Sequence, residues 1–311
     1  MENSRVWQTK IGQTQTSVAD GSVIELIVCR PLPRDPDQTG LTQEDDLSAL
    51  RGLALQLVAM DGDWNHPWGN GILLAPGIGL TAKHVIDDFK TKLAVHELGG
   101  ASIVAIGAAE GAAWLWAVHQ VLSIDGTDLA LLVLDHKTPW NNNLRLHLPE
   151  VHICLPKVGD RVQAFGFRAA EEKFARVEGR NELGIIGISV IGQVNATYPE
   201  GRDSSGLPGP CFEIEMPTVS GMSGGPVFDV SGRLIGIISR SFHWGADDGV
   251  TFASLVWTAA FRNINPIWPK GMYSGPTNLE NISGASNRRC FLSYADNMRW
   301  EYGKLHCDSH S

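Results

Sequence analysis

A serine within a glycine-rich segment is the residue of this chain best suited to catalysis. Ser223 lies in Ser220-Gly-Met-Ser-Gly-Gly-Pro-Val-Phe-Asp229. A serine hydroxyl is a weak nucleophile unless a base accepts its proton and preorganised donors receive the charge on the substrate carbonyl oxygen. Because glycine adopts dihedrals that other residues avoid, the amides of Gly221 and Ser223 could point at one oxygen atom. We predict a nucleophile with its own oxyanion hole; a tight glycine turn between strands is the alternative.

A histidine at the end of a predicted strand is the candidate base. In Gly71-Ile-Leu-Leu-Ala-Pro-Gly-Ile-Gly-Leu-Thr-Ala-Lys-His84, apolar residues lead through a Pro-Gly turn to His84. A lone histidine is more often a surface residue or a satisfied core residue. That interpretation suits four other histidines, namely His66, His96, His119 and His136.

An acidic residue at the start of an apolar run could orient His84. Asp128 precedes Leu129-Ala-Leu-Leu-Val-Leu134, a pattern typical of a buried strand. A carboxylate in that setting needs a hydrogen-bonding partner, and an imidazole N–H is suitable because the carboxylate then fixes its tautomer. A turn residue that begins a strand is the alternative for Asp128. Asp125 is the competing carboxylate, although Ile124-Asp-Gly-Thr127 looks like a turn.

These residues, in this order, resemble the chymotrypsin-like serine peptidase family. Thr81-Ala-Lys-His84 is similar to the family's Thr-Ala-Ala-His, Asp128-Leu-Ala-Leu-Leu132 to Asp-Ile-Ala-Leu-Leu, and Gly221-Met-Ser-Gly-Gly-Pro226 to Gly-Asp-Ser-Gly-Gly-Pro. The resemblance spans about residues 52 to 262. It implies that His84, Asp128 and Ser223 are catalytic and that the amides of Gly221 and Ser223 hold the oxyanion.

The resemblance also implies a substrate pocket at Pro217, Ser239, Arg240, Ser241 and Gly249. Pro217 takes the base of the pocket, where an Asp would select basic side chains. Gly236-Ile-Ile-Ser-Arg-Ser241 is similar to the family's Gly-Ile-Val-Ser-Trp-Gly, and on that match Ser239 would hydrogen-bond Asp128. We expect the pocket to admit an apolar side chain of medium size, although Asp247 and Asp248 nearby could admit a positive charge.

Two departures from the family pattern concern activation and disulfides. Met222 stands where secreted members have an Asp that pairs with the N-terminus freed by zymogen cleavage, so that ion pair cannot form here. Bacterial housekeeping members also lack this Asp. Val85 and Val219 stand where secreted members have cysteines. Reduced thiols are expected, because neither family spacing nor a metal-binding pattern relates Cys29, Cys154, Cys211, Cys290 and Cys307.

The resemblance and the recurring strand signals predict an all-β fold: two six-stranded antiparallel β-barrels, chymotrypsin-like, with the active site in the cleft between them. The 311 residues are 43% hydrophobic and include 34 glycines, which suits many strands and turns. We expect residues 51–145 to form the first barrel, with His84 and Asp128, and residues 146–262 to form the second, with Ser223.

Extensions flank the two barrels. In residues 1–50, Val23-Ile-Glu-Leu-Ile-Val-Cys29 predicts an extra strand on the first barrel, which we favour over a regulatory segment. Thr42-Gln-Glu-Asp45 predicts the start of a helix. In the tail, residues 263–311, we predict a helix over 294–305 that either docks on the body or recruits a partner. Its apolar face would hold Tyr294, Met298, Tyr302 and Leu305.

Charge and composition limit the cellular locations and the classes of binding partner to be expected. A net charge of −9 argues against general nucleic-acid binding. The first residues lack a signal-peptide pattern, and no apolar run is long enough to span a membrane. With unpaired cysteines, these features predict a cytoplasmic protein, and we expect no cofactor and no metal.

These inferences predict a serine endopeptidase of bacterial type that forms an acyl-enzyme intermediate. Its expected partners are a protein or peptide substrate and a regulatory protein bound through an extension, without nucleic acid or membrane. We expect a narrow or partner-regulated substrate range, in a stress or defence pathway. The alternative is a catalytically silent domain of the same fold that binds peptides or scaffolds an assembly.

Overall fold

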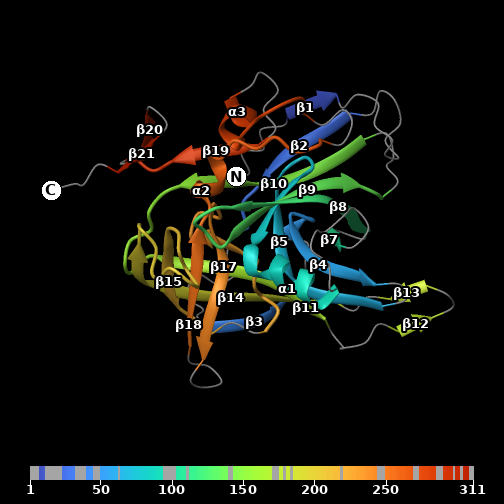
Figure 1. The fold of residues 1–311 in the computed structure, drawn as a ribbon, viewed down its shortest axis with the longest axis horizontal. Coiled ribbons are helices and arrows are strands. Elements are labelled where there is room, and N and C mark those ends of the chain that lie inside the picture. The colour runs from blue at the N-terminus through green and yellow to red at the C-terminus, as the bar shows by residue number, and fades with distance from the viewer. Residues whose placement is uncertain are drawn as a thin grey trace.

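Short apolar runs separated by glycine turns form the strands, and the computed structural model closes most of them into two barrels (Figure 1). The structure describes residues 7–10, 23–31, 40–44, 50–61, 64–93, 103–109, 112–138, 143–169, 175–177, 180–182, 185–217, 220–243, 249–268, 273–284, 290–296, 298–301 and 304–307. The predicted all-β fold with two six-stranded antiparallel barrels is confirmed.

The first barrel follows the strand order β4–β5–β6–β9–β8–β7, and β4 pairs with β7 to close the ring. The run from Leu129 to Leu134 is apolar at every position because β9 is buried along its length. The strands of this barrel are β4 (Ala54–Asp61), β5 (Trp64–Ala75), β6 (Ile78–Ala82), β7 (Ile103–Ala109), β8 (Ala112–Ile124) and β9 (Leu129–His136).

The second barrel follows the order β17–β16–β11–β14–β15–β18, and the pairing of β17 with β18 closes it. A separate hydrophobic cluster fills it, with Val162, Val190, Ile214 and Met222 among its buried members. Its strands are β11 (Arg161–Ala169), β14 (Ile185–Tyr198), β15 (Cys211–Glu215), β16 (Pro226–Asp229), β17 (Leu234–His243) and β18 (Gly249–Leu255).

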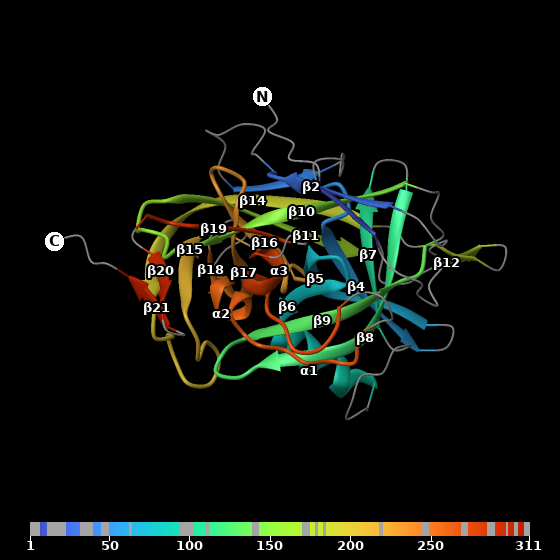
Figure 2. The ribbon, with the colours of Figure 1, turned by 90° about the horizontal axis from the view of Figure 1, so that it is seen from above.

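Strand β10 (Asn143–Ile153) connects the two barrels and pairs with segments from both ends of the chain (Figure 2). β2 (Val23–Cys29) runs parallel to residues 143–149, and β19 (Phe291–Tyr294) runs parallel to residues 150–153. β1 (Trp7–Lys10) pairs with β2 on its other side. Segments near both ends of the chain are therefore built into the body of the protein.

The remaining elements are short. α1 (Lys83–Leu93) follows β6 directly and buries Val85, Ile86 and Phe89. α2 (Trp257–Ala260) and α3 (Leu279–Gly284) follow the second barrel, and their buried residues join the main core of the first barrel. Two hairpins, β12 (Ala175–Val177) with β13 (Arg180–Glu182) and β20 (Met298–Glu301) with β21 (Lys304–Cys307), lie outside the barrels.

The helix predicted over residues 294–305 is wrong. Tyr294 ends β19, and the following described residues form the β20–β21 hairpin. The helical spacing of Tyr294 and Met298 was outweighed by backbone pairing, because β19 supplies the hydrogen bonds that the end of β10 needs. No helix in the described part of the chain is long and apolar enough to cross a membrane.

The helix start predicted at Thr42 is also wrong. Gly40–Glu44 is strand β3, which pairs antiparallel with residues 187–191 of β14. The long strand β14 presents an edge at this point, and pairing with β3 satisfies its backbone groups. Strand β2 was predicted correctly as a strand, and its Leu26 lies in the core of the first barrel although its backbone partner is β10. Asp45 lies outside the described residues.

Candidate active site

Neighbouring strands of the first barrel bring His84 and Asp128 together. β6 pairs with β9 so that Ala82, its last residue, lies opposite Leu129, the first residue of β9. His84 in the first turn of α1 and Asp128 just before β9 therefore extend from adjacent strand ends. The backbone amide of Lys83 also donates to the carbonyl oxygen of Asp128, at 3.0 Å.

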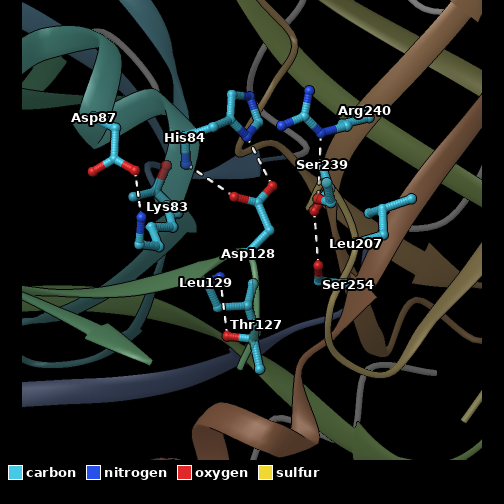
Figure 3. A network of polar contacts seen from close by, with 12 residues as sticks. Lys83, His84, Asp87, Thr127, Asp128, Leu129, Leu207, Ser239, Arg240 and Ser254 are labelled. Carbon is cyan, nitrogen blue, oxygen red and sulfur yellow. Dashed lines mark hydrogen bonds and ion pairs between the residues drawn. The ribbon is translucent and has the colours of Figure 1, made fainter. Parts of the chain in front are cut away.

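The carboxylate of Asp128 contacts His84 at two places (Figure 3). One oxygen, Oδ2, lies 2.8 Å from Nδ1 of the ring, and the other, Oδ1, accepts from the backbone amide at 2.9 Å. The Asp128 side chain is 8% exposed and the His84 side chain 23% exposed. A proton held on Nδ1 leaves Nε2 available as a base, which is the arrangement that general-base catalysis by a histidine requires.

The structure brings Asp128, and not Asp125, to His84. The side chain of Asp125 is 86% exposed and pairs with Arg262 at 3.2 Å. Among the other histidines, His119 is exposed, whereas His136 is fully buried with its ring 4.6 Å from that of Trp116. His96 lies outside the described residues, as does the environment of the His66 side chain.

The segment around Ser223 is a tight turn shaped by two glycines in the left-handed region. Gly221 has a φ of 96° and Gly224 a φ of 81°, conformations that other residues rarely adopt. A Cβ on Gly224 would also lie 2.1 Å from the carbonyl oxygen of Asn70. The amide of Gly225 closes the turn on the oxygen of Met222 at 2.9 Å. Glycine is thus required at position 224 for both conformation and space.

The turn seats Ser223 against the barrel that carries His84. The carbonyl oxygen of Ser223 accepts a hydrogen bond from the amide of Asn70 in β5, at 2.8 Å. A Cβ built on Gly69 would lie 3.1 Å from that same oxygen and 2.9 Å from Val85, the residue after His84. Ser223 is half-buried. The turn of Ser223 and the start of α1, which carries His84, therefore both lie against Gly69 of β5.

The backbone of the turn leaves two donors available. Among the residues that the structure describes, no atom accepts a hydrogen bond from the amide of Gly221 or of Ser223. Such unsatisfied amides near a serine are what an oxyanion hole consists of. The opposite side of the turn is anchored, because Met222 is 1% exposed and packs against Gly166 of β11.

Residues assigned to the pocket lie along β17 and β18 and after β15. Pro217 follows β15 and is half-buried. Gly249 begins β18 opposite His243, and the Ser241 hydroxyl lies 3.3 Å from that of Thr251. Arg240 is exposed and donates through Nε to the oxygen of Gly206, at 3.3 Å. Asp247 and Asp248 lie outside the described residues.

The contact expected between Ser239 and Asp128 is not formed. The hydroxyl of Ser239 is 2.7 Å from that of Ser254 on the neighbouring strand, and both side chains are buried (Figure 3). A register shift between Ile238 and Arg240 places Ser239 at an irregularity in the β17–β18 pairing. The two hydroxyls satisfy each other, and Asp128 has His84 as its partner instead.

The sequence patterns gave no indication of Asn70, which touches the turn of Ser223 with both backbone and side chain. The feature that could have marked it is its place between Gly69 and Gly71, just before the apolar end of β5. Within the described residues, no group of three or more acidic, cysteine or histidine side chains is arranged to hold a metal ion.

A family model for trypsin-like peptidase domains matches residues 69–237, which is more than half of the chain and includes His84, Asp128 and Ser223. No curated protein sequence matches the chain.

Solved structures with a similar fold are distant in sequence. The chain is 17% identical to the active form of the Rv3671c protease from M. tuberculosis, covering 80% of this chain and 96% of that one, with a TM-score of 0.45. It is 16% identical to the MamO protease domain from Magnetospirillum magneticum, covering 67% and 93%, with a TM-score of 0.44. It is 19% identical to Deg5, covering 69% and 88%, with a TM-score of 0.43.

Proposed function

Because the chain belongs to the family of trypsin-like peptidase domains and is a serine endopeptidase, we propose that it cleaves peptide bonds with the triad Ser223, His84 and Asp128. The observation that carries this assignment is the double contact of Asp128 with His84, at 2.8 and 2.9 Å. The position of the Ser223 turn beside Gly69 and Val85 supports it.

In the proposed mechanism, the Ser223 oxygen attacks the carbonyl carbon of the scissile peptide bond while Nε2 of His84 takes the hydroxyl proton. Asp128 keeps the other ring proton on Nδ1 and stabilises the imidazolium. The amides of Gly221 and Ser223 donate to the oxyanion. His84 then gives its proton to the leaving amine, and an ester on Ser223 remains. A water molecule, activated by His84, then attacks the ester carbonyl, which releases the carboxylic acid product and regenerates the Ser223 hydroxyl.

We propose that the peptidase is restrained by its substrate range or by a partner. Met222 cannot make the ion pair that activates clipped zymogens, and its burial anchors the turn without one. A peptidase that needs no zymogen cleavage to form its turn must have its activity limited in another way. A narrow substrate, or a regulatory protein in a stress or defence pathway, would supply it, and the cysteine pattern supports a cytoplasmic location.

Substrate preference is proposed from Pro217, Ser241 and Gly249. These residues carry no charge, so a pocket that they line would favour an apolar side chain of medium size at the cleaved bond. A fluorogenic peptide library with the residue before the cleaved bond varied would measure this preference. Selective cleavage after Arg or Lys would show the preference to be wrong and would direct attention to Asp247 and Asp248.

The triad is tested by labelling the purified full chain with a fluorophosphonate probe, followed by intact-mass measurement. We expect one adduct on the wild-type protein and none on Ser223→Ala or His84→Ala. Circular dichroism of each variant controls for folding. A folded wild-type protein that takes up no probe would contradict the proposal and favour a silent peptide-binding domain.

A further inference from the structure

Asn70 is a fully buried amide that joins the two barrels at the catalytic turn. It lies in β5 of the first barrel, with 1% of its surface exposed. A primary amide in such a place costs free energy unless its hydrogen bonds are made. The hydrogen bonds that the Asn70 side chain makes therefore explain why an amide is buried at this point of the fold.

Every polar group of the Asn70 side chain has a partner in the second barrel. Oδ1 accepts from the amide of Phe167 in β11 at 2.7 Å, and Nδ2 donates to the carbonyl oxygen of the same residue at 3.2 Å. Nδ2 also donates to the carbonyl oxygen of Gly221. Two donor hydrogens and one acceptor oxygen are thus all used, which is the full capacity of an asparagine except for one lone pair.

The backbone of Asn70 binds the same turn. Its amide donates to the carbonyl oxygen of Ser223 at 2.8 Å, and its own carbonyl accepts from the hydroxyl of Thr81. One residue therefore holds the carbonyls of Gly221 and Ser223, and these are the two residues whose amides form the proposed oxyanion hole.

The bond to Gly221 matters because this glycine has little else to fix it. Gly221 is exposed, and glycine has the largest choice of backbone conformations. Among the residues that the structure describes, Asn70 is the sole hydrogen-bond partner of the Gly221 carbonyl. Holding that carbonyl fixes the plane of the Gly221–Met222 peptide. The Gly221 amide belongs to the preceding peptide, so its direction is set relative to this fixed plane by the φ and ψ of Gly221 alone.

We propose that Asn70 is a positioning residue that sets the oxyanion turn when the two barrels dock, and so replaces the ion pair that a freed N-terminus would otherwise make. This proposal rests on the proposed function of Ser223. Two residues share the anchoring of the turn. Met222 anchors it to the core of the second barrel, and Asn70 anchors it to the barrel that carries His84. No cleavage of the chain is needed for either contact.

The test compares Asn70→Ala with Gln56→Ala. Gln56 is a matched control because it is also a buried amide and lies opposite Asn70 in β4. Among the described residues, its side chain binds first-barrel carbonyls alone, those of Gly69 at 2.7 Å and Leu57 at 3.3 Å. We expect the rate constant of fluorophosphonate labelling to fall about 100-fold in Asn70→Ala, the effect of losing one oxyanion donor. The labelling rate constant of Gln56→Ala should stay within about threefold of the wild-type value, because this substitution removes no bond to the turn and no oxyanion donor.

A second readout does not depend on activity. Hydrogen exchange of the peptide that spans residues 219–225 should become faster in Asn70→Ala and remain unchanged in Gln56→Ala, because the turn loses its anchor only in the first. If the wild-type protein takes up no probe, the proposed function fails, whereas the exchange comparison still decides whether Asn70 orders the turn.

Asn70→Asp extends the test with a side chain of nearly the same shape as asparagine. The carboxylate has the same shape and keeps the acceptor for Phe167, but it faces the carbonyls of Phe167 and Gly221 without a hydrogen to donate. We expect a slow-labelling protein with fast exchange over the turn. A folded variant at position 70 that labels within about threefold of the wild type, or that shows unchanged exchange over the turn, would overturn the proposal.

Discussion

Asp128 holds His84 by two different atoms, the ring Nδ1 and the backbone amide, with one carboxylate oxygen on each. The backbone contact fixes where the residue begins α1, and the ring contact fixes its tautomer. The carboxylate therefore sets both the position and the protonation pattern of the imidazole, and these two effects can be separated by substitution.

Asp128→Asn should abolish most of the activity while leaving the fold intact. An amide of the same shape can keep one contact, but its NH₂ group would favour the wrong tautomer of His84. We expect kcat, or the saturated labelling rate, to fall about 10⁴-fold. Asp125→Asn is the control, since Asp125 is exposed and pairs only with Arg262, and it should label like the wild type. Equal labelling of both variants would remove Asp128 from the triad.

Met222→Asp should destabilise the protein, although it restores the family residue at that position. The side chain is 1% exposed, and a Cβ on Gly166 would lie 3.0 Å from its Cγ, so a carboxylate there would be buried without a cation. We expect a loss of about 3 kcal/mol or more in urea unfolding. Met222→Leu should cost less than about 1.5 kcal/mol and keep labelling. Unchanged stability of Met222→Asp would mean that an unrecognised cation reaches the turn.

The residues proposed to be catalytic could be selected from the sequence because their local sequence patterns are distinctive. Gly221 and Gly224 occupy the left-handed conformations that their turn requires, and Asp128 lies where an apolar strand begins. The two barrels were likewise indicated by recurring short apolar runs. These features depend on neighbours in the chain, so a single sequence displays them.

Features that depend on contacts between segments far apart in the chain could not be predicted from the sequence. Residues 294–305 show helical spacing, yet β19 pairs with β10, a strand more than a hundred residues away. Ser239 matches a family position, but its hydroxyl forms a hydrogen bond with that of Ser254 on the neighbouring strand. Asn70 gained its role only because barrel docking brings Phe167 and Gly221 to it. Such contacts follow from the assembled fold and leave no periodic signal.

Removal of the tail after Asn263 should unfold the protein. Leu279, Ile282 and Cys290 are buried in the core of the first barrel, β19 pairs with β10, and the Tyr273 hydroxyl donates to Pro76 at 2.8 Å. Burial of each large apolar side chain contributes about 1.5–3 kcal/mol, so their joint loss approaches the whole stability of a domain.

The control for this truncation ends the chain after Asp296, which keeps β19 and removes residues 297–311 with the β20–β21 hairpin. We expect cooperative melting and normal labelling for the longer protein, and aggregation or a lost melting transition for the shorter one. Normal labelling of the chain that ends at Asn263 would instead favour a tail that recruits a partner.

His136 should make stability fall in acid. Burial lowers its pKa to about 3 from an ordinary value of 6.5, and its fully buried ring contacts those of Trp114 and Trp116. Above pH 6.5 the imidazole is neutral in both states and contributes no pH dependence. Below pH 6.5 the His136 imidazole is protonated in the unfolded chain but stays neutral in the native protein. The free energy of unfolding therefore falls by about 1.4 kcal/mol per pH unit until about pH 3.

Urea unfolding between about pH 7.5 and about pH 4.5 measures this slope in the wild type and in His136→Phe, which keeps an aromatic ring but cannot titrate. At about pH 4.5 the wild type should have lost about 3 kcal/mol through this group, and His136→Phe should lose correspondingly less. A residual slope is expected, because burial and the charge of Arg233 also lower the pKa of His152. His119→Gln, at an exposed position, should keep the full slope. Identical slopes in His136→Phe and the wild type would show that protons reach His136 without unfolding of the barrel.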